Sequence, residues 1–233
     1  MIETDVWPIV IPSSLGLRVL SYARWPETED DTLPPIPGFI VSSFNPLVAE
    51  VADRCLRRRT TRPAANVRRE PTGSGTDDRR LDDAQFDDTG FSGTALDGTA
   101  LDGAGFNDTG FDDAAAPART ALLLASVGGD RATAQAIAEA VRSGRRVPPL
   151  LFFQSNPNAV LGHIAARRRL TGPVVCVSPP PDSAGGITAD ALTEADWLLR
   201  DGDADEVLLI AAEQGARPGE GDRAEAVLVD RRP

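Results

Sequence analysis

The chain contains no lysine and only one histidine. All 24 of its basic residues are arginine, so the glycine pair at residues 128–129 lacks the lysine with which a P-loop holds nucleotide phosphates. The pair also lacks dinucleotide-binding spacing, and we interpret it as a structural turn between a strand and a helix. His163 has no cysteine or carboxylate near it at the spacing of metal ligands, and a single histidine does not form a metal site. We therefore expect neither a metal nor a cofactor.

Long apolar runs and paired cysteines are also missing. No run approaches the length of a membrane-spanning helix, and the first eight residues, MIETDVWP, are acidic where a signal peptide would be basic. Cys55 and Cys176 are the only cysteines, and their spacing matches no disulfide or zinc pattern. These absences predict a cytoplasmic protein in a reducing compartment that does not associate with membranes.

The net charge of −11 is concentrated in one segment. Residues 77–113 contain eleven aspartates and two arginines, so the rest of the chain carries a charge of only about −2. A nearly neutral body with an acidic insert argues against binding to nucleic acids or to anionic membrane surfaces.

The acidic segment is repetitive. Residues 81–115 divide into seven five-residue units with Leu or Phe at one position. Such a period is typical of pentapeptide-repeat solenoids, but seven units give less than two coils of about four units each. We expect a low-complexity, disordered insert at residues 63–117, with a small solenoid as the alternative. The insert would interrupt one domain formed by residues 1–62 and 118–233.

Outside the insert, apolar periodicity predicts strands that alternate with helices. The predicted strands are residues 17–23, 121–126, 174–177, 207–212 and 225–229. The first helix begins at Asn45 as N-cap with Pro46 at the first helical position, and later helices begin at Asn156 and Thr188. Arginines 57–59 end the first helix, where they complement its dipole or, alternatively, dock an acidic carrier protein.

Residues 150–213 resemble the ketosynthase branch of the thiolase superfamily. In that family an N-x-x-x-G helix, a leucine and a Gly-Pro pair precede a strand that ends in V-S-T-A-C. A helix ending near I-R-x-G and an A-D-x-x-L strand follow. The residues that match in order are Asn158, Gly162, Leu170, Gly172, Pro173, Val177, Ser178, Ala191, Leu192, Glu194, Ala195, Leu199, Arg200, Gly202, Ala204, Asp205 and Leu208. The resemblance implies the N-terminal half of a thiolase-like α/β fold, with a mixed five-stranded sheet and helices on both faces.

The nucleophile of that family is missing. Counting forward from the Gly-Pro pair puts its position at Pro181, and counting backward from Gly202 puts it at Gly185. Neither residue is nucleophilic, and prolines at 179–181 lack the backbone N–H groups that an oxyanion hole needs. The two histidines of the family belong to the second half of its fold, before which this chain ends. The resemblance implies a truncated, catalytically inactive homologue, so we predict no catalytic residue.

Two residues keep other interpretations open. Cys176 lies inside the predicted strand, where we expect a buried small hydrophobic side chain. Alternatively, an unexpected register exposes Cys176 as the nucleophile of a stand-alone acyltransferase. His163 matches a helix position where condensing enzymes often carry a histidine outside catalysis, which implies a core or interface role.

An inactive ketosynthase homologue resembles the chain-length factor of type II polyketide systems, and a short one resembles the partners in highly reducing and aryl-polyene pathways. This implies a heterodimer with an active ketosynthase, which meets an acyl carrier protein through the complex. The implied partner interface is Val174, Val175, Cys176, Val177 and Ser178. Phe152 and Phe153 would line the acyl tunnel, or else belong to the core. The alternative is a decayed homologue that acts as a scaffold, with the acidic insert as its functional part.

Overall fold

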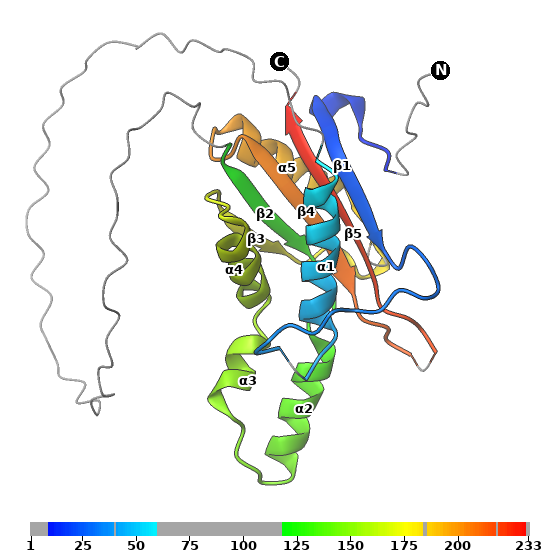
Figure 1. Cartoon of the computed structure of the whole chain (residues 1–233), viewed down its shortest axis with the longest axis vertical. Helices are drawn as coiled ribbons and strands as arrows, with labels where there is room; N and C mark the ends of the chain where they lie inside the picture. The colour runs from blue at the N-terminus through cyan, green and yellow to red at the C-terminus, as the bar shows by residue number, and fades with distance from the viewer. Residues whose placement is uncertain (1–8, 40, 60–117, 184–185, 218, 232–233) are drawn as a thin grey trace, which may run out of the picture. The chain divides into compact units, whose positions relative to one another are not determined.

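A mixed five-stranded sheet forms the centre of the protein in the computed structural model, which describes residues 9–39, 41–59, 118–183, 186–217 and 219–231 (Figure 1). The strand order is β1-β5-β4-β2-β3. β2 pairs in parallel with β3 and β4, whereas β5 pairs antiparallel with β1 and β4. The strands are β1 (Leu17–Trp25), β2 (Thr120–Ala125), β3 (Val174–Val177), β4 (Glu206–Glu213) and β5 (Arg223–Arg231). The predicted mixed sheet is confirmed.

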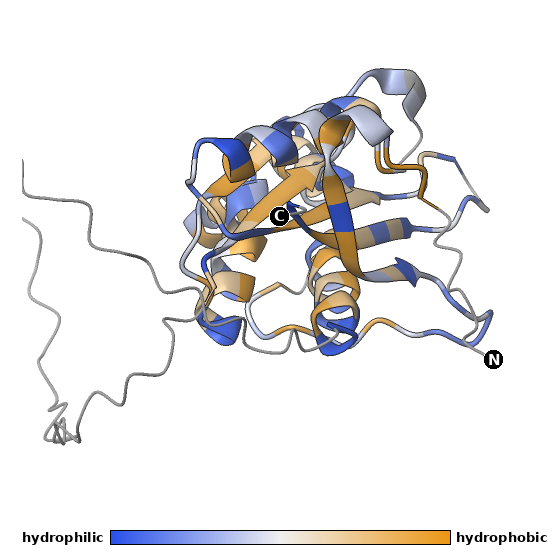
Figure 2. Ribbon diagram, turned by 90° about the horizontal axis from the view of Figure 1, so that it is seen from above, coloured by the Kyte–Doolittle hydropathy of each residue, from blue (hydrophilic) through white to orange (hydrophobic). Residues whose placement is uncertain are grey.

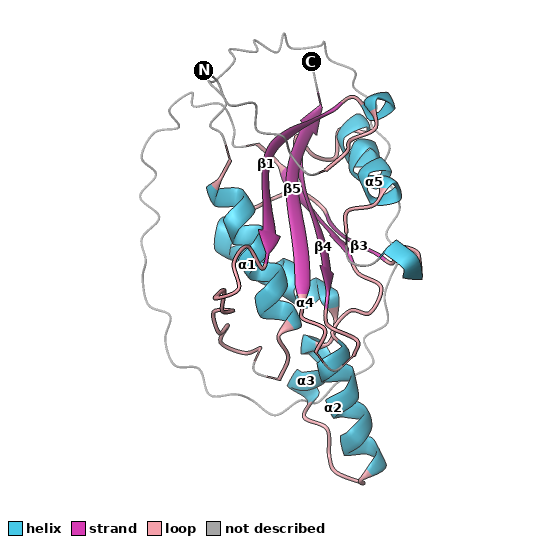
Figure 3. Ribbon diagram, turned by 90° about the vertical axis from the view of Figure 1, so that its right-hand side faces the viewer, coloured by secondary structure: helices cyan, strands magenta, loops and turns pink. Residues whose placement is uncertain are grey.

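Helices cover both faces of the sheet, as predicted (Figure 3). α1 (Phe44–Arg57) and α4 (Pro157–Arg168) pack on one face, and α5 (Ala189–Arg200) packs on the other. α2 (Arg131–Arg142) and α3 (Pro149–Gln154) form a hairpin past the carboxyl end of β2 (Figure 1). Short 3₁₀ turns lie at Ser13–Leu15 and Pro181–Ser183. α3 was not predicted, because six residues are too few to give a clear helical period.

Alternation along β4 divides the core into two layers. Leu208 and Ile210 face α1 and α4, whereas Val207 and Leu209 face α5. Every residue of β4 is buried, since strands lie on both sides of it and helices above and below. Figure 2 shows the apolar residues along these strands and on the helix faces turned towards them. Within the described ranges, no helix is long and apolar enough to cross a membrane.

The predicted helix start at Asn156 and the predicted cap at Thr188 are confirmed. The side chain of Asn156 accepts a hydrogen bond from Asn158 N, and that of Thr188 accepts one from Ala191 N. The predicted cap at Asn45 is wrong, because α1 already begins at Phe44. Asn45 is buried and its amide instead donates to Asp130 Oδ2, at 3.1 Å, so it joins two segments far apart in sequence.

The start of β3 depends on a glycine for space. Gly172 N donates to Thr120 O, which brings its backbone against the start of β2. A Cβ atom on Gly172 would lie 2.5 Å from Ala121 N and from the carbonyl carbon of Thr120. Backbone atoms of a central strand have little freedom to move away, so only glycine at position 172 lets the start of β3 lie this close to β2. α4 itself ends earlier, at Arg168, with Arg169 in the left-handed conformation as its C-cap.

We therefore predict that Gly172→Ala lowers the free energy of unfolding by about 2 kcal/mol or more, because its methyl group overlaps backbone. Gly162→Ala is the matched control, since Gly162 lies on the exposed side of α4 with no atom near its Cβ position. The control should raise stability by roughly 0.5–1 kcal/mol, as expected for an exposed helical glycine. Urea denaturation measures both changes. Equal effects of the two substitutions would contradict the steric explanation.

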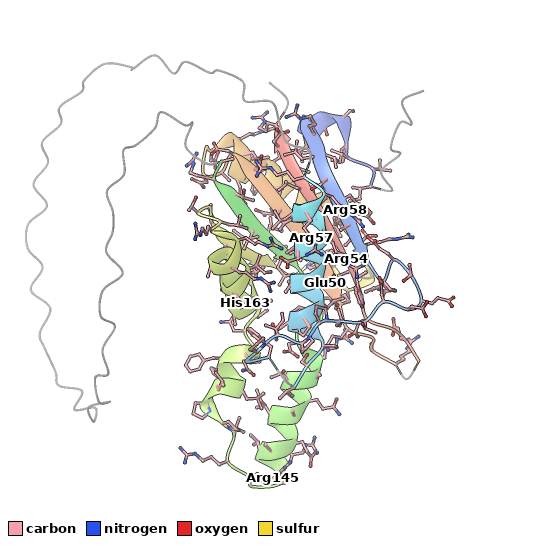
Figure 4. All side chains as sticks on the ribbon, viewed as in Figure 1. Glu50, Arg54, Arg57, Arg58, Arg145 and His163 are labelled. Atoms are coloured by element: carbon pink, nitrogen blue, oxygen red, sulfur yellow. The ribbon has the colours of Figure 1, made fainter. Side chains whose placement is uncertain are left out.

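The face of α1 turned away from the sheet carries a charged network (Figure 4). Arg54 donates to Asp31 at 2.8 Å and to Glu50 at 2.7 Å, and its guanidinium lies 4.7 Å from the centre of the Trp25 ring. The guanidinium and the backbone N–H of Glu27 hold the pKa of Asp31 well below its usual range. The network fastens the loop after β1 to the helix.

The two ends of the segment 60–117 meet at one carboxylate. Glu206 Oε1 accepts a hydrogen bond from Arg59 at 2.6 Å, and Glu206 Oε2 accepts one from the hydroxyl of Thr120 at 3.5 Å. Arg119 binds the neighbouring Asp205. Arg58 pairs with Glu27, so the arginines of 57–59 serve the protein's own carboxylates. The predicted insert at 63–117 itself lies outside the described residues.

Because both ends are held at one point, we predict that residues 62–117 can be replaced by about six glycine and serine residues, which span up to about 20 Å. The shortened chain should keep the near-ultraviolet circular dichroism of the full chain and unfold within a few degrees of it. A deletion variant that loses its fixed tertiary signal would show that the body needs the insert.

Candidate functional site

β3 is an edge strand of the sheet. It pairs with β2 through the Cα partners Leu122–Val174 to Ala125–Val177, and no described strand lies beyond it. Val174 is 40% exposed and Cys176 is exposed, whereas Val175 and Val177 pack towards α5. The apolar run is therefore compatible with a strand that is open on one side.

The hydrogen bonds of β3 fix which groups face outward. Leu122 N donates to Pro173 O, and Ser126 N donates to Val177 O. The N–H and C=O groups of one residue in a parallel ladder point to the same side, and successive residues alternate. The backbone groups of Val174, Cys176 and Ser178 therefore point away from β2, towards the open edge.

The segment between β3 and α5 contains no cysteine among its described residues. Pro179 and Pro180 lead into the 3₁₀ turn Pro181–Ser183, and Gly186 precedes the Thr188 cap of α5. Of the two counted nucleophile positions, Pro181 begins this turn and Gly185 lies outside the described residues. The hydroxyl of Ser183 donates to Pro180 O at 2.6 Å, within the turn itself.

Cys176 is exposed, so the prediction of a buried small side chain was wrong. The cause is the edge position of β3, which periodicity does not reveal. Its thiol donates to Asn158 Oδ1 on α4, at 3.0 Å. Partial desolvation by the neighbouring atoms raises the pKa of the Cys176 thiol, which disfavours the reactive thiolate.

His163 does not face this thiol. It lies five residues beyond Asn158 on α4, which is about 140° around the helix. Its ring packs edge-on against Phe39, with centroids 6.0 Å apart, and Nε2 has no hydrogen-bond partner among the described residues (Figure 4). The imidazole therefore has a packing position that agrees with the expected core role.

A glutamate of the protein occupies the nearest anion site. The turn after β2 directs the N–H groups of Val127 and Gly128 and the hydroxyl of Ser126 at the carboxylate of Glu213, which is buried at the end of β4. Such a cluster of N–H groups is typical of sites for phosphate or an oxyanion. An internal carboxylate fills it, in agreement with the interpretation of residues 128–129 as a structural turn.

The α2–α3 hairpin exposes aromatic side chains. Phe152 is 66% exposed and Phe153 is 67% exposed, with their ring centroids 6.2 Å apart. Val141 and Leu150 are also exposed, and a groove of about 510 Å³ lies between the two helices. The alternative that these phenylalanines belong to the core is wrong, because the hairpin extends past the sheet (Figure 1).

The residues named from sequence form two groups. Residues 174–178 lie together on one edge, and Phe152 and Phe153 lie together on the hairpin. Glu213 was not predicted as a functional residue, although its place at the end of a long apolar run was a usable signal. No group of three or more histidine, cysteine or acidic side chains among the described residues is arranged to hold a metal.

No family model matches the chain, and no curated protein matches it. Among solved structures, a ketosynthase in complex with its chain length factor from Xenorhabdus doucetiae matches with a TM-score of 0.55 and 13% identity. The match covers 93% of this chain and 79% of that one. The chain therefore has a ketosynthase-like, thiolase-type fold, as the resemblance implied.

Two further structures match over a smaller part. The ishigamide ketosynthase/chain length factor gives a TM-score of 0.42 at 20% identity and covers 51% of this chain and 37% of that one. A β-ketoacyl synthase from Burkholderia phymatum gives 0.38 at 17% identity, with coverage of 52% and 37%. Both scores are below 0.5, so no argument rests on them.

Proposed function

We propose that this chain is a non-catalytic, chain-length-factor-like subunit that pairs with an active ketosynthase in polyketide or polyene biosynthesis and shapes its acyl pocket. The observation that carries the proposal is the open edge of β3, which leads into three prolines where the family has its cysteine. The fold shared with a ketosynthase–chain length factor complex supports it.

The pairing would extend one sheet into another. Val174, Cys176 and Ser178 present outward backbone groups, and exposed edges of this kind recruit a further strand. The partly exposed Val174 side chain adds apolar area to the edge. A ketosynthase strand laid antiparallel against β3 would satisfy these groups, and the acyl carrier protein would reach this chain only through the complex.

The absence of catalysis is argued from three local features. The only thiol near the strand has a raised pKa, the only imidazole of the chain lies on another side of α4, and Glu213 occupies the anion site after β2. A cysteine nucleophile needs the opposite of each: a lowered pKa, an adjacent base and free N–H donors.

The edge contact is tested by Cys176→Pro. Proline removes the outward N–H and adds a ring at the open side, but it leaves the bonds from β2 to Pro173 and Val177 in place. We predict that the variant folds and that its affinity for the ketosynthase falls at least about tenfold. Cys176→Ser keeps the N–H and should pair normally. Co-purification from cells that express both subunits measures the outcome, and undiminished pairing of the proline variant would contradict the interface.

The pocket-shaping role is tested by Phe152→Ala and Phe153→Ala. Both side chains are exposed, so we expect each change in unfolding free energy to stay within about 0.5 kcal/mol. If the rings line the partner's acyl pocket, their removal should shift the product distribution towards longer chains while the complex stays intact. Val141→Ala, on the other helix of the hairpin, is the control. Mass spectrometry of the released products decides, and an unchanged distribution would contradict the role.

The exposure of Cys176 favours one second candidate, a stand-alone acyltransferase. The Cys176→Ser variant separates the two functions, because it should leave product formation by the complex intact if this chain is not catalytic. A stable acyl adduct on Cys176 after incubation with acyl-CoA would favour the acyltransferase. A scaffold function would appear as binding to other proteins without any ketosynthase in the complex.

A further inference from the structure

A second pocket lies at the carboxyl ends of β2 and β4, and Pro181, in the turn after β3, is among its lining residues. Its volume is about 250 Å³, and three arginines from three parts of the chain line it. Arg131 begins α2, Arg217 lies in the loop after β4, and Arg223 begins β5. The carboxyl ends of parallel strands are where α/β proteins commonly bind ligands.

The carboxylates of the pocket already have partners. Glu213 accepts hydrogen bonds from the turn after β2, including Gly128 N at 3.0 Å. Glu220 accepts one from Ala216 N at 3.0 Å and lies 3.7 Å from Arg223. Within the residues that the structure describes, Arg131 and Arg217 have no carboxylate partner. Neither guanidinium group forms an ion pair within these residues, although Glu213 and Glu220 also line the pocket.

The position of Arg131 is set by the turn beneath it. A Cβ atom on Gly128 would lie 2.0 Å from Arg131 Nε and 2.7 Å from its guanidinium carbon. The guanidinium thus lies directly over the glycine, and only glycine leaves it this space. Any larger residue at position 128 would displace the arginine side chain.

The base of the pocket is held by buried hydrogen bonds. Gln214 is buried; its carbonyl oxygen accepts from Ala132 N at 3.1 Å, and its amide donates to Ser42 Oγ and Ser43 Oγ. This side chain connects the start of α2 with the start of α1. The pocket floor is therefore formed by satisfied, fixed groups, and the two arginines supply the available binding capacity.

We propose that this pocket binds a small polyvalent anion, a phosphate compound or a dicarboxylate, through Arg131 and Arg217. A guanidinium group matches both anions because it donates two parallel N–H bonds to their oxygens. Glu213 fills the N–H groups of the turn, so the ligand is held by side chains rather than by a P-loop. None of residues 174–178 lines this pocket.

Titration calorimetry of the full chain tests the site, with pyrophosphate and malonate as separate probes and potassium chloride at matched ionic strength as the blank. We expect saturable binding of at least one probe, and the probe bound more tightly identifies phosphate or carboxylate as the preferred group. Arg131→Gln and Arg217→Gln should each weaken binding about tenfold, as expected for the loss of a charge-assisted hydrogen bond.

Two further variants test whether binding depends on the position of Arg131 in the pocket rather than on the total charge of the protein. Gly128→Ala keeps both arginines but displaces Arg131, and it should weaken binding as Arg131→Gln does. Arg142→Gln, at the other end of α2, removes the same charge outside the pocket and should leave binding within about twofold. Neither probe binding above the salt blank, or an equal loss in Arg142→Gln, would overturn the proposal.

Discussion

The proposed pairing of this protein with a ketosynthase depends on the outward-facing N–H and C=O groups of β3. β2 satisfies one side of the strand, through Pro173 and Val177, and leaves Val174, Cys176 and Ser178 facing outward. An apolar edge of this kind is a liability for an isolated chain unless another strand covers it. β3 is thus fully hydrogen-bonded on the side that faces β2, and its other side can accept a further strand.

In the proposed function, this region keeps an assembly surface and lacks the groups that catalysis needs. The cysteine of a condensing enzyme depends on the helix that follows the strand and on free N–H donors around it. Here three prolines and a 3₁₀ turn separate β3 from α5, and Glu213 occupies the N–H groups after β2. Neither feature alters the pairing of β3 with β2. Under the proposed function, assembly and catalysis rest on different residues, so one could persist without the other.

Most of the fold could be predicted from sequence, because four of the five strands contain a continuous apolar run and two helices carry recognisable caps at Asn156 and Thr188. The predictions that were wrong concern residues whose surroundings are determined by tertiary contacts. Asn45 has the residue type and the position of a helix cap, but its amide donates to Asp130, 85 residues away. Cys176 was expected to be buried, since a four-residue apolar run does not reveal whether a neighbouring strand exists on each side. The arginine pocket was also beyond prediction, because Arg131 lies 86 residues from Arg217 in the sequence.

Amide hydrogen exchange at β3, in the free chain and in the complex with a ketosynthase, tests the central claim most directly. Val175 and Val177 already face β2, so their exchange should change little. The amides of Val174, Cys176 and Ser178 should exchange rapidly in the free chain and slow markedly on pairing, because a partner strand would accept their hydrogen bonds. A stable complex in which these three amides exchange as fast as in the free chain would show that the partner binds elsewhere.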